Sequence, residues 1–148
     1  MPRLHYLFAI TLFLLLSSCS PKNEQNNFIQ PQCLASQSQC NITVSLGNFD
    51  ILFNVETVLT EQTFNIIVKN NSLNDNLEIK GFLEGKEMYM GKIPLFFNKT
   101  KPQIFNAETL LGSCSEAEMV WRMWLYISDK TNREVTDKVF IDFKSYRG

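Results

Sequence analysis

Apolar residues at every second position constrain the fold of this chain more than any other feature. The longest alternating run is Met119, Trp121, Met123, Leu125 and Ile127. Shorter runs occur at 42–46, 49–55, 64–68, 77–83, 88–90, 104–111 and 139–143. Residues two apart lie on one face of a strand, and no long segment repeats with the helical period of 3.6. The pattern predicts an all-β fold, a single immunoglobulin-like antiparallel β-sandwich over residues 41–148. The capping-box spacing of residues 115–118 leaves one helical turn as a local alternative.

The first eighteen residues have the composition of a secretion signal. Arg3 supplies a positive charge, and residues 7–16 are apolar except for Thr11. This run is shorter than the roughly 20 residues that span a membrane, which favours a signal peptide over 1–18. The segment Leu16-Ser17-Ser18-Cys19 resembles the lipobox of bacterial lipoproteins. The resemblance implies cleavage before Cys19 and anchoring in the lipid bilayer through acyl chains on Cys19. The alternative is an ordinary signal peptide that is cut near a cysteine.

The residues after Cys19 predict an envelope location and a tether. Ser20 takes the place of the Asp that retains many enteric lipoproteins in the inner membrane. We therefore expect a lipid-anchored protein of the bacterial envelope, in the outer rather than the inner membrane, facing the periplasm. Residues 19–40 are rich in Asn and Gln and contain two prolines, which is typical of a flexible spacer.

Composition excludes several classes of function. His5 is the single histidine and would leave with the signal peptide. Ser-His-Asp triads and His-ligated zinc are then excluded. Of fourteen basic residues, the loss of Arg3 leaves thirteen against fifteen acidic ones. No basic cluster or glycine-rich phosphate loop is present, so nucleic acid is not an expected partner. We predict a binding or accessory module and no enzyme activity.

Three cysteines remain once Cys19 is lipidated, namely Cys33, Cys40 and Cys114. An oxidising compartment favours a disulfide, and the odd number leaves one thiol over. Chain entropy gives about 2.5 kcal/mol for Cys33–Cys40 and about 4.5 kcal/mol for a bridge to Cys114. Short loops close readily, which favours Cys33–Cys40, but the other pairings stay open. A free Cys114 would be a small buried apolar residue, a redox thiol or a soft metal ligand.

Methionines accompany these cysteines. Met88 and Met90 are predicted on one face of a strand, about 7 Å apart. Thioether and thiolate sulfurs without histidine select Cu(I). The sequence therefore predicts a Cu(I) site from Met88, Met90 and Cys114, with Met119 as a further candidate. The alternative is that these methionines fill the core.

Two aromatic residues lie on the face opposite the longest run. Trp124 and Tyr126 would form an interaction patch for an envelope protein if they are exposed. The alternative is that they pack beneath a loop or against neighbouring strands.

Short motifs between residues 81 and 125 carry a family resemblance. They are Gly81-Phe82-Leu83-Glu84-Gly85, Met88-Tyr89-Met90-Gly91, Pro94, Leu110-Leu111-Gly112-Ser113-Cys114 and Met119-Val120-Trp121. This order resembles uncharacterised proteobacterial envelope proteins of FixH-like or YtkA-like, immunoglobulin-like character. The resemblance implies a β-sandwich, an early cysteine pair matched by Cys33 and Cys40, and a role in copper handling and cytochrome oxidase assembly. The sites of periplasmic copper chaperones combine His with Met. This chain departs from them because its mature part has no histidine, which argues against tight Cu(II) binding.

Overall fold

The computed structural model describes residues 39–132 and 136–148, and all regular structure in these ranges is strand. The strands are β1 (Gln39–Val44), β2 (Gly47–Phe53), β3 (Val58–Leu59), β4 (Phe64–Asn70), β5 (Leu77–Gly85), β6 (Lys92–Leu95), β7 (Asn98–Lys101), β8 (Ile104–Thr109), β9 (Glu118–Asp129) and β10 (Thr136–Tyr146). The predicted cleavage site, Cys33 and residues 19–38 of the predicted tether lie outside the described residues, whereas its last two residues, Gln39 and Cys40, belong to β1. The first strand begins at Gln39, two residues before the predicted start of the domain.

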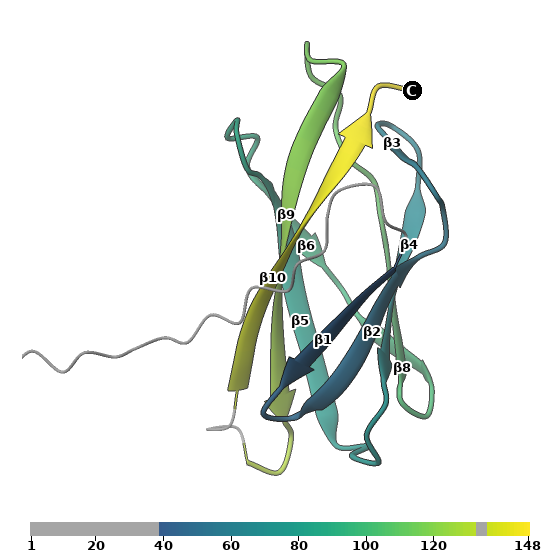
Figure 1. Ribbon diagram of the computed structural model, residues 1–148, viewed down its shortest axis with the longest axis vertical. Helices are drawn as coiled ribbons and strands as arrows, with labels where there is room; N and C mark the ends of the chain where they lie inside the picture. Colours follow the sequence, from purple (N-terminus) through teal and green to yellow (C-terminus); the bar gives the residue numbers. More distant parts are fainter. Residues whose placement is uncertain (1–38, 133–135) are drawn as a thin grey trace, which may run out of the picture.

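The strands form two five-stranded sheets that face each other (Figure 1). One sheet has the order β1-β2-β4-β8-β7 and the other β3-β10-β9-β5-β6. Strands β2-β4-β8-β7 and β10-β9-β5 reproduce the A-B-E-D and G-F-C orders of an immunoglobulin domain. The predicted immunoglobulin-like β-sandwich is therefore confirmed. One pair departs from the antiparallel pattern, because β3 lies parallel to β10.

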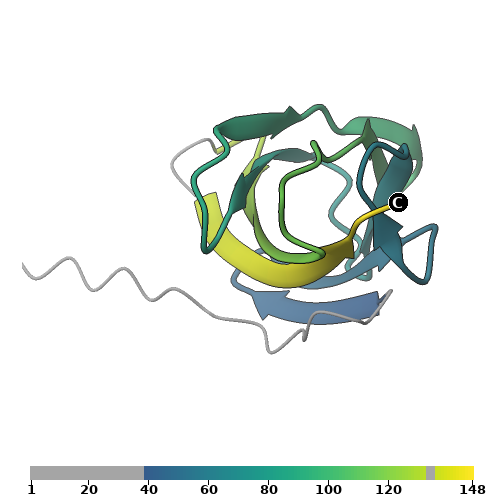
Figure 2. The same ribbon diagram turned by 90° about the horizontal axis from the view of Figure 1, so that it is seen from above.

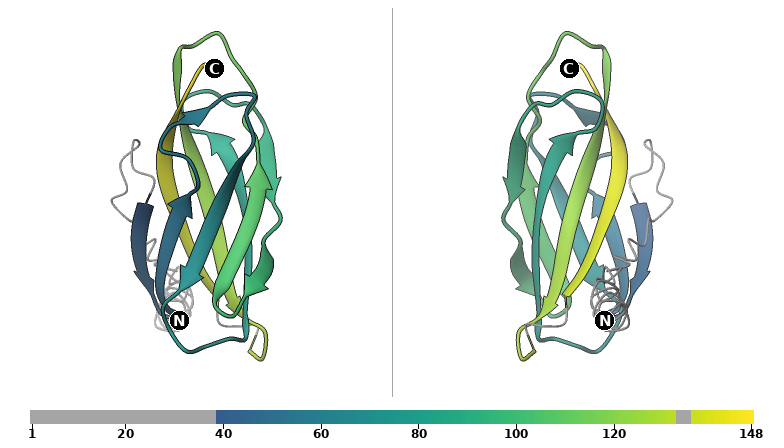
Figure 3. Two further views of the ribbon diagram at one scale, coloured as in Figure 1. Left: turned by 90° about the vertical axis from the view of Figure 1, so that its right-hand side faces the viewer. Right: turned by 90° about the vertical axis from the view of Figure 1, so that its left-hand side faces the viewer.

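The core lies between the two sheets, which curve around it when the molecule is seen from above (Figure 2). Strand β9 is central in its sheet, and its residues Trp121, Met123, Leu125 and Ile127 are at most 1% exposed. Figure 3 shows the two sheets in turn, with β9 flanked by β10 and β5 in the right-hand view. Alternation thus places one side of β9 in the core, and this burial of apolar area is the main stabilising contribution.

The predicted strand at Met88–Met90 is wrong, because residues 86–91 form a loop between β5 and β6. A Cβ on Gly85 would lie 2.1 Å from the carbonyl oxygen of Met88, so the backbone approaches Gly85 too closely for any side chain. Gly91 has a φ of 79°, in the left-handed region that glycine adopts without strain. These two glycines allow the chain to turn sharply between β5 and β6, although the spacing of Met88 and Met90 is also that of a strand.

The single helical turn considered for residues 115–118 is also absent. Residues 115–117 form a bend, and β9 begins at Glu118. The amide of Glu116 donates a hydrogen bond to the sulfur of Cys114, 3.3 Å away.

Candidate functional site

Two of the four predicted sulfur ligands are in direct contact at one end of the sandwich. The Sγ atom of Cys114, in the loop between β8 and β9, lies 2.8 Å from the Sδ atom of Met119, the first inward residue of β9. Met119 is buried, whereas Cys114 is half-buried and carries a free thiol. This end of the molecule is the one that carries the C-terminus in Figure 1. We call Cys114 and Met119 the sulfur pair.

The loop that carries Cys114 is held by the residues that follow β10. The Nη2 atom of Arg147 donates to the carbonyl oxygen of Cys114 at 2.8 Å and also to that of Ser115. The amide of Arg147 donates to the carbonyl oxygen of Ala117 at 3.0 Å. Since β10 pairs with β9 as far as Glu118, this arrangement fixes the loop over the start of β9. The sequence did not point to Arg147, because no local pattern links it to residues thirty or more positions away.

The other two predicted ligands divide between the interior and the solvent. Met90 is half-buried and packs against the core. Its Cε atom lies 3.9 Å from the position that a Cβ on Gly112 would take, two residues before Cys114. Met88 has 44% of its surface exposed, far more than the buried Met119. The structure therefore brings Met90 to the neighbourhood of the sulfur pair and leaves Met88 on the outside of the loop.

The available donors at this end are soft sulfurs. Across residues 39–132 and 136–148, no group of three or more His, Cys, Asp and Glu side chains could hold a metal ion. A thiol and a thioether in contact, with a second thioether nearby, are donors that suit Cu(I) and not hard cations. With metal–sulfur bonds of about 2.3 Å, two ligands of one ion lie roughly 4 Å apart, close to the spacing of two sulfurs in ordinary contact. The unbranched side chain of Met119 has the rotatable bonds to adjust to an ion.

Cys40 lies on β1, in the other sheet from β9, and is disulfide-bonded. Cys33 lies outside the described residues, and Cys114 is free. The pairing of Cys33 with Cys40 stays a prediction.

The predicted interaction residues belong to a row of rings on the outer face of the second sheet. Trp124 and Tyr126 of β9 are joined there by Phe82 of β5 and Phe140 of β10. The ring centroids of Trp124 and Phe140 are 5.0 Å apart, and Phe82 lies 6.4 Å from each of the two β9 rings. All four residues are half-buried. We call these four residues the aromatic row. Phe82 and Phe140 face outward because side chains alternate along β5 and β10 as they do along β9.

Cationic side chains cover the aromatic row. Lys92 lies 4.3 Å from the centroid of Phe82, Lys138 4.6 Å from that of Trp124 and Arg122 4.0 Å from that of Phe140. These cation–π contacts and the contacts between rings partly shield the aromatic faces. Trp124 and Tyr126 are therefore packed against residues of neighbouring strands, which was the alternative to an exposed patch in the sequence analysis.

An ion-pair network borders the aromatic row. Asp142 accepts hydrogen bonds of 2.7 and 3.0 Å from Arg122 and forms a 2.9 Å ion pair with Lys86. Burial of the carboxyl group opposes its ionisation, but the bonds from Arg122 and Lys86 prevail and lower the pKa of Asp142. The hydrogen bond to Asp142 likewise raises the pKa of Arg122. The network fixes opposite charges beside the rings.

Comparisons with known proteins bear on the fold. No protein-family model matches the sequence, and no curated protein matches it. The structure is similar to that of a DUF4785 family protein from Legionella pneumophila, with a TM-score of 0.53 and 14% sequence identity. The similarity covers 68% of this chain and 28% of that one, so the two share a fold over a minor part of the larger protein. In residues 39–132 and 136–148, no helix has the length and apolar character needed to cross a membrane.

Proposed function

We propose that this protein is a non-enzymatic lipoprotein of the bacterial envelope whose sandwich domain handles Cu(I) through Cys114 and Met119. The observation that carries the metal proposal is that the sulfurs of Cys114 and Met119 are direct neighbours at the end of the sandwich. The lipobox residues Leu16 to Cys19 carry the proposal of anchoring through acyl chains on Cys19. A role in support of respiratory oxidase assembly rests on the family resemblance of residues 81–125.

The environment of the sulfur pair supports Cu(I) in particular. Cys114 is a free and partly exposed thiol, so an ion arriving from solvent has access to it. Met119 and Met90 add softer, uncharged donors from the buried side. A thiolate with thioethers and no imidazole favours Cu(I) over Cu(II) or Zn²⁺. Met88 belongs to the proposal as a peripheral ligand that the loop 86–91 would have to bring inward.

A competition titration tests the metal proposal. The full chain, reduced and kept anaerobic in detergent, is titrated with Cu(I) against a chromophoric chelator. We expect Cys114→Ser and Met119→Leu each to weaken binding at least tenfold, and Met90→Leu to weaken it less. Met123→Leu is the matched control, because Met123 is buried on the same face of β9 but lies four residues farther along the strand than Met119. Equal affinities for the wild type and Cys114→Ser would refute the proposal.

Metabolic labelling tests the anchor separately. Cells that express the full chain are grown with radioactive palmitate and then fractionated by density. We expect label in the chain and recovery with the outer membrane, and loss of both in Cys19→Ala. Label that persists in this variant, or a wild-type chain without label, would contradict lipidation at Cys19.

Docking of an envelope protein on the aromatic row is a second candidate function. Four half-buried rings present apolar surface beside side chains of both charges, which suits a partner with apolar and polar side chains. Crosslinking in cells tests it by comparing the wild type with Tyr126→Ala. Tyr89→Ala is the control, because Tyr89 is 82% exposed but lies in the loop 86–91. An adduct that survives Tyr126→Ala, or that Tyr89→Ala removes equally, would count against this surface.

A further inference from the structure

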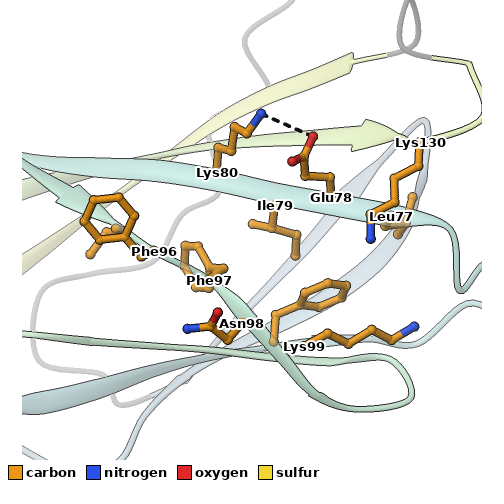
Figure 4. Close-up of a pocket in the computed structure, with 11 residues that line it drawn as sticks. Leu77, Glu78, Ile79, Lys80, Phe96, Phe97, Asn98, Lys99 and Lys130 are labelled. Carbon is orange, nitrogen blue, oxygen red and sulfur yellow. Dashed lines mark ion pairs between the residues drawn. The ribbon is translucent and has the colours of Figure 1, made fainter.

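A cavity of about 310 Å³ lies between the edges of the two sheets, away from the sulfur pair. Its walls come from β5, the end of β6, β7 and β8, together with the segment that joins β6 to β7 (Figure 4). Small-molecule sites in proteins begin at about 300 Å³. The cavity is therefore large enough for a small ligand.

The inner wall of the cavity is apolar. Leu77, Ile79, Leu95 and Phe105 line it, and each is at most 4% exposed. Phe96 also lines the cavity but has 75% of its surface exposed, which makes it one of the most exposed large apolar side chains in the described ranges. An apolar wall that continues into an exposed ring offers a surface on which a hydrocarbon or aromatic group gains free energy by leaving water.

The rim of the cavity carries an excess of positive charge. Lys80, Lys99 and Lys130 line it, and Glu78 is the acidic residue among the lining side chains. Glu78 pairs with Lys80 at 3.2 Å, and Lys99 contacts the carboxylate of Asp75 at 3.2 Å. Within the described ranges no carboxylate pairs with Lys130. Figure 4 shows its side chain extending past Leu77 toward the pocket.

We propose that this cavity binds an anionic amphiphile, a small molecule with one aliphatic or aromatic group and one carboxylate. The apolar group would lie against Ile79 and Phe105, and the carboxylate would meet Lys130 at the rim, with Lys99 beside it. An ammonium without a carboxylate partner, at the mouth of an apolar cavity, gains a charge-assisted hydrogen bond when such a ligand arrives. This site is independent of the proposed copper chemistry, because it shares no residue with it.

Methyl NMR with octanoate tests the site. The full chain is held in phosphatidylcholine nanodiscs with labelled isoleucine and leucine methyl groups, and empty nanodiscs measure partitioning of octanoate into lipid. We expect saturable shifts of the Ile79 methyl signals with octanoate and at least fivefold weaker binding of octanol and octylammonium. Lys130→Met should weaken octanoate binding at least fivefold. Lys101→Met is the control, because Lys101 lies on β7 near Lys99 but does not line the cavity.

Each outcome of this experiment decides the proposal. Absence of saturable shifts at millimolar octanoate would overturn it. Equal binding of octanoate and octylammonium would overturn the charge argument, and an effect of Lys101→Met equal to that of Lys130→Met would refute a local role for the rim. The spectra also report folding, and if Lys130→Met does not fold, Lys130→Gln takes its place under the same criterion.

Discussion

Replacement of Ser145 by alanine should destabilise the domain through a hydrogen bond between two buried side chains. The indole Nε1 of Trp121 donates to the hydroxyl oxygen of Ser145 at 3.0 Å, and both residues are 1% exposed. Ser145→Ala leaves the indole N–H buried without its acceptor, which costs about 1–3 kcal/mol. For a domain of roughly this size, each kcal/mol corresponds to about 4–8 °C in Tm. A loss of about 2 kcal/mol should therefore lower Tm by roughly 8–16 °C.

A double-mutant cycle separates the hydrogen bond from general packing. Unfolding of the full chain in urea is followed by far-UV circular dichroism for the wild type, Ser145→Ala, Trp121→Phe and the double variant. Since phenylalanine has no N–H group, Ser145→Ala should cost less than about 0.5 kcal/mol in the Trp121→Phe background. Equal costs of Ser145→Ala in both backgrounds would show that the serine contributes by packing, and would refute the reasoning.

Three further outcomes follow from local contacts. The pKa of Asp142 is lowered in the folded protein, so its stabilisation is complete above the unfolded value of about 3.9 and is lost as pH falls through the folded pKa. Urea titrations from pH 2 to 7 should show a steeper acid loss for the wild type than for Asp142→Asn, and identical profiles would contradict this. Gly85→Ala should cost about 1–3 kcal/mol, because its Cβ would meet the Met88 carbonyl oxygen, and should shift the amide NMR signals of residues 86–91. Gly91→Ala, with open space around its Cβ, should cost only about 1 kcal/mol through its positive φ, so a larger loss than for Gly85→Ala would reverse our interpretation.

The sequence predicts the long strands well because apolar residues alternate along them at the positions that are buried. The β9 run from Met119 to Ile127 alternates in sequence and in the structure alike. The strands that were not predicted are short and lie at the sheet edges. All four residues of β7 are exposed, and β3 has two residues. Edge strands with polar side chains bury too little apolar area to leave a pattern in the sequence.

The candidate site was predicted by residue type and only in part by arrangement. Sulfur chemistry points to Cys114 and Met119 without a structure, but their contact depends on how the loop before β9 folds back. That path is set by Arg147, which is distant in sequence. The position of Met88 was wrongly predicted for a similar reason. The turn that exposes Met88 depends on the close approach of its carbonyl oxygen to Gly85, and alternation of apolar residues does not indicate such a contact.

The edge strands acquire a further importance if the domain is held at a membrane surface. Anchored chains diffuse in two dimensions and meet side by side at high local density, where unpaired strand edges favour sheet growth between molecules. Strand β6 carries Pro94, which has no amide hydrogen to offer a neighbour, and β7 carries Lys99 and Lys101. Proline and lysine at sheet edges oppose such association. The polar residues and the proline that make β6 and β7 hard to predict from the sequence would thus also oppose sheet growth at these two edges when copies of the protein are crowded.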